Sequence, residues 1–417
     1  MSRSFPSGTV KAWPLRFATQ IRHHSAQKIH RATVQSRGMT FAFTVEQQTF
    51  LDTVRRFAET RVAPHAAELD ATGVYPSPLV REAAALGLMG LCVARDQGGA
   101  GRDYVTYAAA IEIVSAASAT LAVILSVNNS LVAETIAQFG SPLQQETWLG
   151  RLARGEAIGS FALSETDAGS DAANQQTVAK LDDRGYVISG RKIWVANAEV
   201  ADVAIVFAAT EPDARGRGIS AFLVPLDARG VTRVPSPESL GVRGLGCVDL
   251  ELNDVRVEAG ALLGEAGRGF RVAMRALEGG RIAIAAQALG VGQAALEEAL
   301  RYSRARHAFG QPIGNFQAIQ FQLADIATEL SAARMLTWKA ADTRDRAPRA
   351  SLEASMAKLQ ASESAHRAAD RAMQILASAG YTRGSLVERL FRDVRATEIY
   401  QGTSEIQRMI IAEHILA

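Results

Sequence analysis

Two segments of this chain combine residue types that can bind anions. Residues 161–171, FALSETDAGSD, gather glycine, serine and threonine in one loop. The backbone N–H groups and hydroxyls of such a loop suit phosphates and the polar edge of a planar ring. Arg306 ends a predicted helix, where its guanidinium can form a two-pronged contact with a diphosphate. Taken singly, the two features are also typical of a polar loop closing a strand and of a basic helix end.

A third segment, residues 400–408 (YQGTSEIQR), resembles the C-terminal signature of the acyl-CoA dehydrogenase family. That family usually has Tyr-Glu-Gly-Thr-Ser here, and its Glu removes the alpha proton of the substrate. Gln401 takes the place of this Glu. Because an amide cannot accept a proton at neutral pH, the resemblance implies a flavoenzyme scaffold without its customary base.

Four further segments match the same family in chain order, and the resemblance covers about residues 42–417. They are residues 161–171, 192–197, 306–317 and 374–381. The resemblance implies that the chain binds FAD. The cofactor-binding residues that it implies are Phe161, Leu163, Ser164, Gly169, Ser170, Trp194, Ala196, Arg306, Phe309, Gln317, Gln374, Gly380, Thr403 and Glu405.

The chain departs from the family pattern at four positions besides Gln401. Ala196 replaces a Thr that donates a hydrogen bond near the hydride-accepting nitrogen of the flavin. Ala377 and Ser378 replace glycines that let the backbone approach the FAD diphosphate closely. Some relatives carry the base one residue before Arg281 instead, and Gly280 stands there. The alternative base is therefore also missing.

The substrate residues are carried over from the same resemblance. They are Gln401 at the position of the catalytic base and Ser170, Glu278, Arg281, Tyr400 and Gly402 around the thioester and its CoA arm. Residues 126–130 (SVNNS) and 282–290 (IAIAAQALG) are similar to the short-chain type within the family. The resemblance thus implies alpha,beta-dehydrogenation of short- or branched-chain acyl-CoA thioesters, with electrons passed to electron-transferring flavoprotein. It also implies a homotetramer in which a second subunit completes each flavin site.

Other functions are compatible with the missing base. A base-less family member could perform other flavin or thioester chemistry, such as enoyl-CoA reduction or beta-elimination. A non-catalytic paralogue could bind FAD and acyl-CoA as a sensor or partner subunit. A flavin monooxygenase of similar fold is a further alternative, against which the CoA-side residues Ser170 and Arg281 argue.

The hydrophobic periodicity predicts an α+β fold in the order helices, β module, helices. Apolar residues three or four apart indicate helices over residues 42–160. Short alternating segments at 185–190, 203–207, 219–224 and 248–252 indicate the strands of a β module, which the resemblance implies is a barrel-like domain over residues 161–269. Long Ala-rich segments near 270–306, 317–345 and 351–378, and a short one from 404, indicate a helical bundle over residues 270–417.

The first 41 residues form a separate basic N-terminal extension. Residues 1–38 contain seven Lys/Arg and no Asp or Glu, as in a mitochondrial transit peptide or an upstream start chosen before Met39. We therefore expect the mitochondrial matrix if the segment is a transit peptide and the cytoplasm if the protein is bacterial. The remaining residues are slightly acidic, which argues against nucleic acid as a partner.

The composition also bears on metals, disulfides and membranes. Cys92 and Cys247 are too few for a disulfide framework and lack metal-ligand spacing, so no metal site is expected. No run of about 18 uninterrupted apolar residues occurs, so no membrane span is expected.

Overall fold

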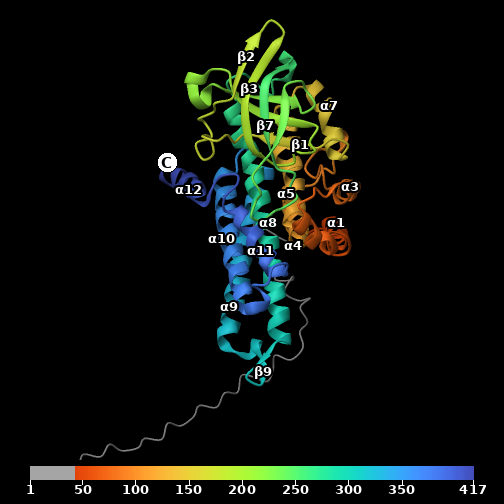
Figure 1. The fold of residues 1–417 in the computed structure, drawn as a ribbon, viewed down its shortest axis with the longest axis vertical. Coiled ribbons are helices and arrows are strands. Elements are labelled where there is room, and N and C mark those ends of the chain that lie inside the picture. The colour runs from red at the N-terminus through yellow and green to blue at the C-terminus, as the bar shows by residue number, and fades with distance from the viewer. Residues whose placement is uncertain (1–42) are drawn as a thin grey trace, which may run out of the picture. The chain divides into compact units, whose positions relative to one another are not determined.

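The computed structural model describes residues 43–417, and residues 45–417 form one compact unit. The predicted extension over residues 1–41 lies outside the described residues. Figure 1 shows the predicted order in the compact unit, with helices first, a sheet next and a helical bundle last. The α+β fold class expected from periodicity is therefore confirmed.

In the described part of the chain, from residue 43 on, seven α-helices precede the sheet. They are α1 (Val45–Phe57), α2 (Ala66–Thr72), α3 (Ser77–Ala85), α4 (Tyr104–Ala117), α5 (Ala119–Ser126), α6 (Glu134–Phe139) and α7 (Pro142–Ala153). A π-helical segment, η5 (Val127–Ala133), continues α5 into α6. Within the described residues, the helical stretch Ala119–Phe139 is long and apolar enough to cross a membrane, but 94% of its apolar window is buried inside the protein. It is the central helix of the core.

A curled seven-stranded sheet follows. Its strands are β1 (Gly159–Ala162), β2 (Val178–Asp182), β3 (Gly185–Val195), β4 (Val203–Ala209), β5 (Ile219–Pro225), β6 (Val231–Pro235) and β7 (Val248–Val257). The spatial order is β1-β4-β2-β3-β7-β6, and β5 pairs with β4. The four strands predicted from alternation are β3, β4, β5 and β7. The short strands β1, β2 and β6 were not predicted.

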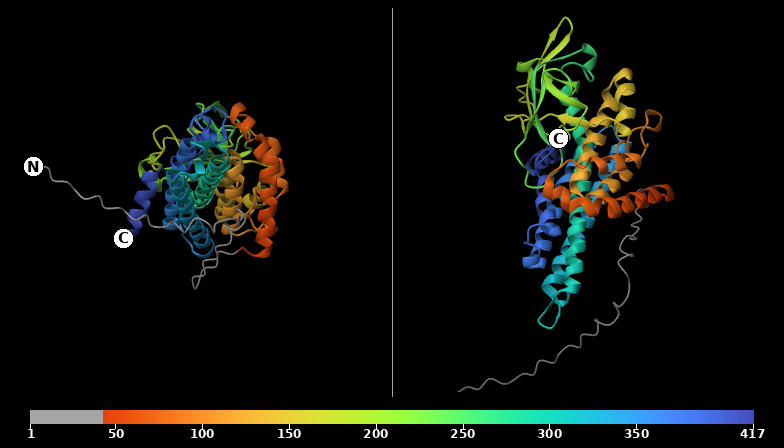
Figure 2. Two further views of the ribbon diagram at one scale, coloured as in Figure 1. Left: turned by 90° about the horizontal axis from the view of Figure 1, so that it is seen from below. Right: turned by 45° about the vertical axis from the view of Figure 1, so that its right-hand side comes forward.

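The bundle consists of α8 (Gly269–Ala305), α9 (Gln317–Arg346), α10 (Ser351–Leu376), α11 (Leu386–Thr397) and α12 (Ser404–Leu416). The helix α11 was not predicted. Helices α8 and α10 run side by side in the same direction, because Ala350 N–H faces the Glu278 carboxylate and Ala365 packs against Gly292. A hairpin of β8 (His307–Ala308) and β9 (Gln311–Pro312) links α8 to α9 at the end of the bundle that lies away from the sheet (Figures 1 and 2).

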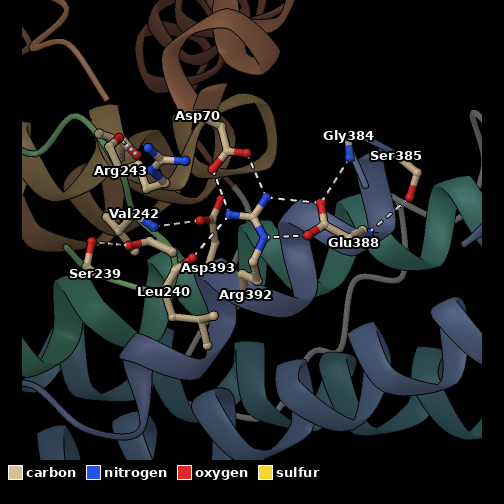
Figure 3. A network of polar contacts seen from close by, with 12 residues as sticks. Asp70, Ser239, Leu240, Val242, Arg243, Gly384, Ser385, Glu388, Arg392 and Asp393 are labelled. Carbon is tan, nitrogen blue, oxygen red and sulfur yellow. Dashed lines mark hydrogen bonds and ion pairs between the residues drawn. The ribbon is translucent and has the colours of Figure 1, made fainter. Parts of the chain in front are cut away.

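A polar network fastens α11 to both α2 and the connection between β6 and β7 (Figure 3). The Arg392 guanidinium pairs with Asp70 of α2 at 2.6 Å and with Glu388 at 2.6 Å. Asp393 accepts a 2.6 Å hydrogen bond from the backbone N–H of Val242. Further along this connection, the carbonyl of Leu245 accepts from the N–H of Asn197, just beyond β3. The end of β3 and α11 are thus both hydrogen-bonded to the connection between β6 and β7.

Candidate active site

The predicted flavin-facing residues of the sheet lie on and beside β3. The Trp194 indole is 48% exposed, and its backbone takes a left-handed conformation with φ 55° at an irregularity in the β3–β7 pairing. The loop after β1 runs alongside, since the Ser164 carbonyl accepts a 2.9 Å hydrogen bond from Ile193 N–H. Ser164 therefore lies beside the part of β3 that carries Trp194. A planar ring stacked on this indole would cover apolar surface that the single chain leaves open.

A buried ion pair holds that loop against β3. Lys192 donates to the carboxylate of Glu165 at 2.6 Å and to the Leu163 carbonyl at 3.2 Å, and both charged side chains are almost fully buried. Glu165 also accepts hydrogen bonds from the backbone N–H groups of Gln176 and Thr177. The adjacent lysine and these hydrogen bonds lower the pKa of Glu165 despite its burial. The sequence comparison missed this pair.

Other parts of the predicted cofactor set lie apart from one another. Phe161 packs against Phe207 at 4.9 Å between ring centroids, and Ala196 packs on the same core. Leu163 is buried, whereas Gly169 and Ser170 are exposed on the loop. Thr403 caps α12 and accepts from Ile406 N–H, with Glu405 in the first turn of that helix.

A second group of predicted cofactor residues lies at the other end of the bundle. Arg306 and Phe309 belong to the hairpin segment, and Gln317 begins α9. The Phe309 ring is 95% exposed and takes φ 50°. Because α10 runs alongside α8 in the same direction, Gln374 and Gly380 at its end lie toward the same end of the bundle. Within one chain this group is separated from Trp194 by the length of the bundle (Figure 1).

Gln401 lies against α8. Its backbone has φ 54°, and Gly402 follows with φ 95°. A Cβ atom at Gly280 would lie within 3.0 Å of both the Gln401 amide oxygen and a Leu131 methyl group. That amide oxygen is buried and has no hydrogen-bond partner among the described residues. The two positions where the family places a base are thus in contact, and neither carries a carboxylate.

The neighbouring Gly279 accommodates a buried polar cluster, which we call the Glu134 cluster: Tyr104, Glu134, Glu278 and Arg344. The Tyr104 hydroxyl donates to the Glu134 carboxylate, and Arg344 bridges Glu134 to Glu278. A Cβ at Gly279 would lie within 3.0 Å of the Tyr104 hydroxyl. Burial, reinforced by the Glu134 charge, raises the pKa of Tyr104 well above its usual range. Nothing in the sequence comparison signalled this cluster.

The predicted substrate residues have unequal surroundings. Glu278 is 2% exposed, and its carboxylate already pairs with Arg275, Arg344 and Arg349. Arg281 is also buried, with no described partner for its Nε, and burial lowers its pKa to about 10. Arg281 thus keeps an unused donor beside Gly280, whereas the Glu278 oxygens are occupied.

Tyr400 precedes Gln401 and bonds to α8. Its hydroxyl donates to the side-chain oxygen of Gln287, and burial raises its pKa above the ordinary value. Ser170 remains on its exposed loop. Tyr400 and Gln401 thus both contact α8, the helix that carries Gly280 and Arg281.

Strained backbone concentrates in the predicted site. Among the described residues, eight that are not glycine have positive φ, and four of them are Trp194, Phe309, Ala377 and Gln401. Such conformations cost about 1–3 kcal/mol each and persist where surrounding structure enforces them. These four residues lie in the segments that carry the sequence motifs.

Comparisons with known proteins agree with this geometry. Residues 44–156, 160–255 and 267–416 match the family models for the N-terminal, middle and C-terminal domains of acyl-CoA dehydrogenase. The chain is 45% identical over 369 residues to the mitochondrial short-chain specific acyl-CoA dehydrogenase of Homo sapiens, covering 88% of this chain and 90% of that protein.

Two solved structures share the fold at similar identity. Butyryl-CoA dehydrogenase from Megasphaera elsdenii has a TM-score of 0.89 and 39% identity, covering 91% of this chain and all of that chain. A chain in a structure described as the electron transferring flavoprotein of Acidaminococcus fermentans has a TM-score of 0.89 and 37% identity, with the same coverage.

Proposed function

Because this chain belongs to the acyl-CoA dehydrogenase family of FAD-dependent oxidoreductases, we propose that it oxidises short-chain acyl-CoA thioesters, with Gln401 limiting the rate. The preference for short chains rests on the likeness to a short-chain specific relative over 88% of this chain. The limit on rate rests on one observation. Gln401 and Gly280 contact each other where the family base belongs, and neither can accept a proton.

Different residues of this chain would bind the flavin and orient the substrate. FAD, when bound, supplies the acceptor for the beta hydride. Trp194 and the Ser164 loop would hold its ring, and the free Nε donor of Arg281 would orient the thioester arm. The Gln401 amide can position a substrate by hydrogen bonding but cannot take its alpha proton. General bases contribute roughly 10²–10⁴-fold, so turnover by this chain should be slower by that order.

Glu134 is a carboxylate beside Gly279, the residue before Gly280, but its geometry does not suit a base. One of its oxygens accepts from Tyr104, and the other pairs with Arg344 and accepts from Gln138 at 2.7 Å. Both carboxylate oxygens are thus occupied by donors of this chain, and neither is free to face a substrate. We therefore propose that removal of the substrate's alpha proton is the rate-limiting step.

The same observation favours a second function. A chain lacking both bases could bind acyl-CoA without oxidising it, or carry out enoyl-CoA reduction, which adds a proton to the alpha carbon instead of removing one. Spectra of the flavin-loaded protein, recorded without oxygen, separate these functions. Bleaching by butyryl-CoA indicates dehydrogenation. Reoxidation of the reduced flavin by crotonyl-CoA, without bleaching by butyryl-CoA, indicates reduction. A spectral shift without either change indicates binding alone and would refute the first proposal.

Assembly and electron transfer are part of the proposal. Arg306, Phe309, Gln317, Gln374 and Gly380 lie far from Trp194 in one chain, which supports a homotetramer in which they serve the flavin of a neighbour. The likeness to a chain in the Acidaminococcus fermentans structure supports electron-transferring flavoprotein as the acceptor. Light scattering of the flavin-loaded protein tests the assembly. A flavin-loaded monomer would refute it.

Localisation remains tied to the N-terminal extension. We propose the mitochondrial matrix if residues 1–38 act as a transit peptide, and otherwise the cytoplasm of a bacterium. A fusion of residues 1–38 to a fluorescent protein, expressed in eukaryotic cells, tests the first case. Diffuse fluorescence would refute it.

A further inference from the structure

The backbone, rather than the side-chain amide, fixes the position of Gln401. Gln401 and Gly402 take consecutive left-handed conformations. The Gln401 amide oxygen has no hydrogen-bond partner among the described residues and so does not hold the side chain in place. A strained pair of this kind relaxes unless other groups enforce it. The groups that bind the two carbonyl oxygens therefore decide where side chain 401 points.

Two buried side chains bind those carbonyl oxygens. Lys358 of α10 donates to the Gly402 carbonyl at 2.6 Å. Gln407 of α12 donates to the same carbonyl at 2.8 Å and to the Gln401 carbonyl at 3.4 Å. Both side chains have no exposed surface. The loop is thus clamped between two helices of the bundle.

The ammonium of Lys358 is costly to bury. Its pKa is lowered to about 7, first by burial and then by the nearby charge of Arg281 on α8. Glu398 after α11 and Glu405 on α12 act in the opposite direction, while Glu398 itself pairs with His366 and Arg395. An apolar residue of equal length would avoid this cost. Within residues 43–417 the Lys358 ammonium makes one direct hydrogen bond, to the loop that carries residue 401, and this bond indicates what the buried lysine provides.

We propose that Lys358 is a positioning residue for the reaction: it holds the 401–402 loop so that side chain 401 reaches across to Gly280 and the substrate's alpha carbon. This inference deepens the proposed function and rests on it. Gln407 supports the same loop, but only Lys358 brings a charge. Arg281 is a buried cation, and Lys358 is a second one below neutral pH, so the loop then lies in a positive field suited to a carboxylate at position 401.

Hydrogen exchange tests the clamp without requiring any activity. Lys358→Met removes the donor and keeps most of the side-chain length, and Lys358→Arg restores a cationic donor. Ser355→Ala is the matched control, because Ser355 lies one turn earlier on α10 and its buried hydroxyl has no partner among the described residues. We expect Lys358→Met to speed exchange of amides 399–404 at least about tenfold, the effect of one lost hydrogen bond to a charged group. Ser355→Ala should leave that exchange unchanged. Equal exchange in Lys358→Met and the control would overturn the proposal.

Kinetics in the Gln401→Glu background test the effect on chemistry. Adding Lys358→Met should lower the limiting rate of flavin reduction at least about tenfold while changing the dissociation constant of butyryl-CoA less than threefold. It should also move the acid limb of the pH–rate profile up by about one unit, because removal of a cation raises the pKa of a neighbouring carboxylate. Lys358→Arg keeps a cation at this position, so the acid limb of its pH–rate profile should stay where it is in Gln401→Glu alone.

Failure of the proposed function and failure of the positioning role of Lys358 give different results. A Gln401→Glu protein that butyryl-CoA does not reduce refutes the proposed function, and the exchange experiment still decides the role of Lys358. An active Gln401→Glu protein whose rate and pH profile are unaffected by Lys358→Met refutes the positioning role alone.

Discussion

The flavin side and the proton side of this site are built differently. On the flavin side, Trp194 and Phe309 are exposed in strained conformations and lie in different parts of one chain. On the proton side, Gln401 packs on Gly280 and its loop is clamped by Lys358 and Gln407 within the same chain. The difference teaches that a single subunit determines the position of residue 401, whereas in the proposed assembly flavin binding depends on surfaces of two subunits.

The largest change is expected on the flavin side, from Arg306→Glu. If Arg306 faces a diphosphate, charge reversal should weaken flavin binding at least about a hundredfold, since hydrogen bonds to charged groups contribute roughly 1.5–3 kcal/mol and repulsion is added. Flavin content and the flavin dissociation constant measure this. Arg304→Glu, two residues earlier in the last turn of α8, is the matched control. A similar loss in both variants would show a general charge effect instead.

The proton side should respond to Gly279→Ala through stability. The new methyl group would lie within 3.0 Å of the Tyr104 hydroxyl, which belongs to the Glu134 cluster. Overpacking of this kind costs about 1–3 kcal/mol in free energy of unfolding. Urea denaturation measures it. Gly260→Ala, where a Cβ would meet nothing within 4 Å, should change stability little. Equal changes in the free energy of unfolding in the two variants would show that a methyl group at position 279 causes no overpacking.

The smallest change should come from Ala377→Gly. Ala377 has φ 52° and ψ −131°, a region that favours glycine, at the end of α10. Relief of the strain should raise the free energy of unfolding by about 1 kcal/mol, net of the greater flexibility of glycine. Ala379→Gly in the same turn relieves no positive φ and should lower it by about 0.5–1 kcal/mol. Thermal unfolding of the two variants gives the comparison, and a loss of stability in Ala377→Gly would contradict it.

Local sequence patterns predicted much of the fold. Alternating residues predicted β3, β4, β5 and β7, and long Ala-rich segments predicted α8, α9 and α10. The short strands β1, β2 and β6 have four or five residues, too few for a clear alternation. The helix α11 was missed even though its apolar residues follow a helical period, because it is only 12 residues long and lies between two recognised motifs.

The site was predictable only where a local motif carried it. Gln401 and Arg306 are recognisable from their neighbours in sequence. Lys358 is not, because a lone lysine in an Ala-rich helix usually indicates a solvent-exposed face, and its partner is 44 residues away. The Glu134 cluster likewise joins residues up to 240 positions apart, since Arg344 lies over the Tyr104 ring. Such contacts depend on how helices pack, which a single sequence does not specify.

The most direct test compares the rates at which butyryl-CoA reduces the flavin in wild type and Gln401→Glu, by stopped flow without oxygen. Gln and Glu are nearly equal in size, so the substitution should leave the contact with Gly280 and the loop unchanged. The account predicts that Gln401→Glu reduces its flavin at least about a hundredfold faster, the lower end of the general-base range. Equal rates, at equal flavin content and equal substrate affinity, would contradict it, because another group would then remove the alpha proton or that proton would not be removed at all.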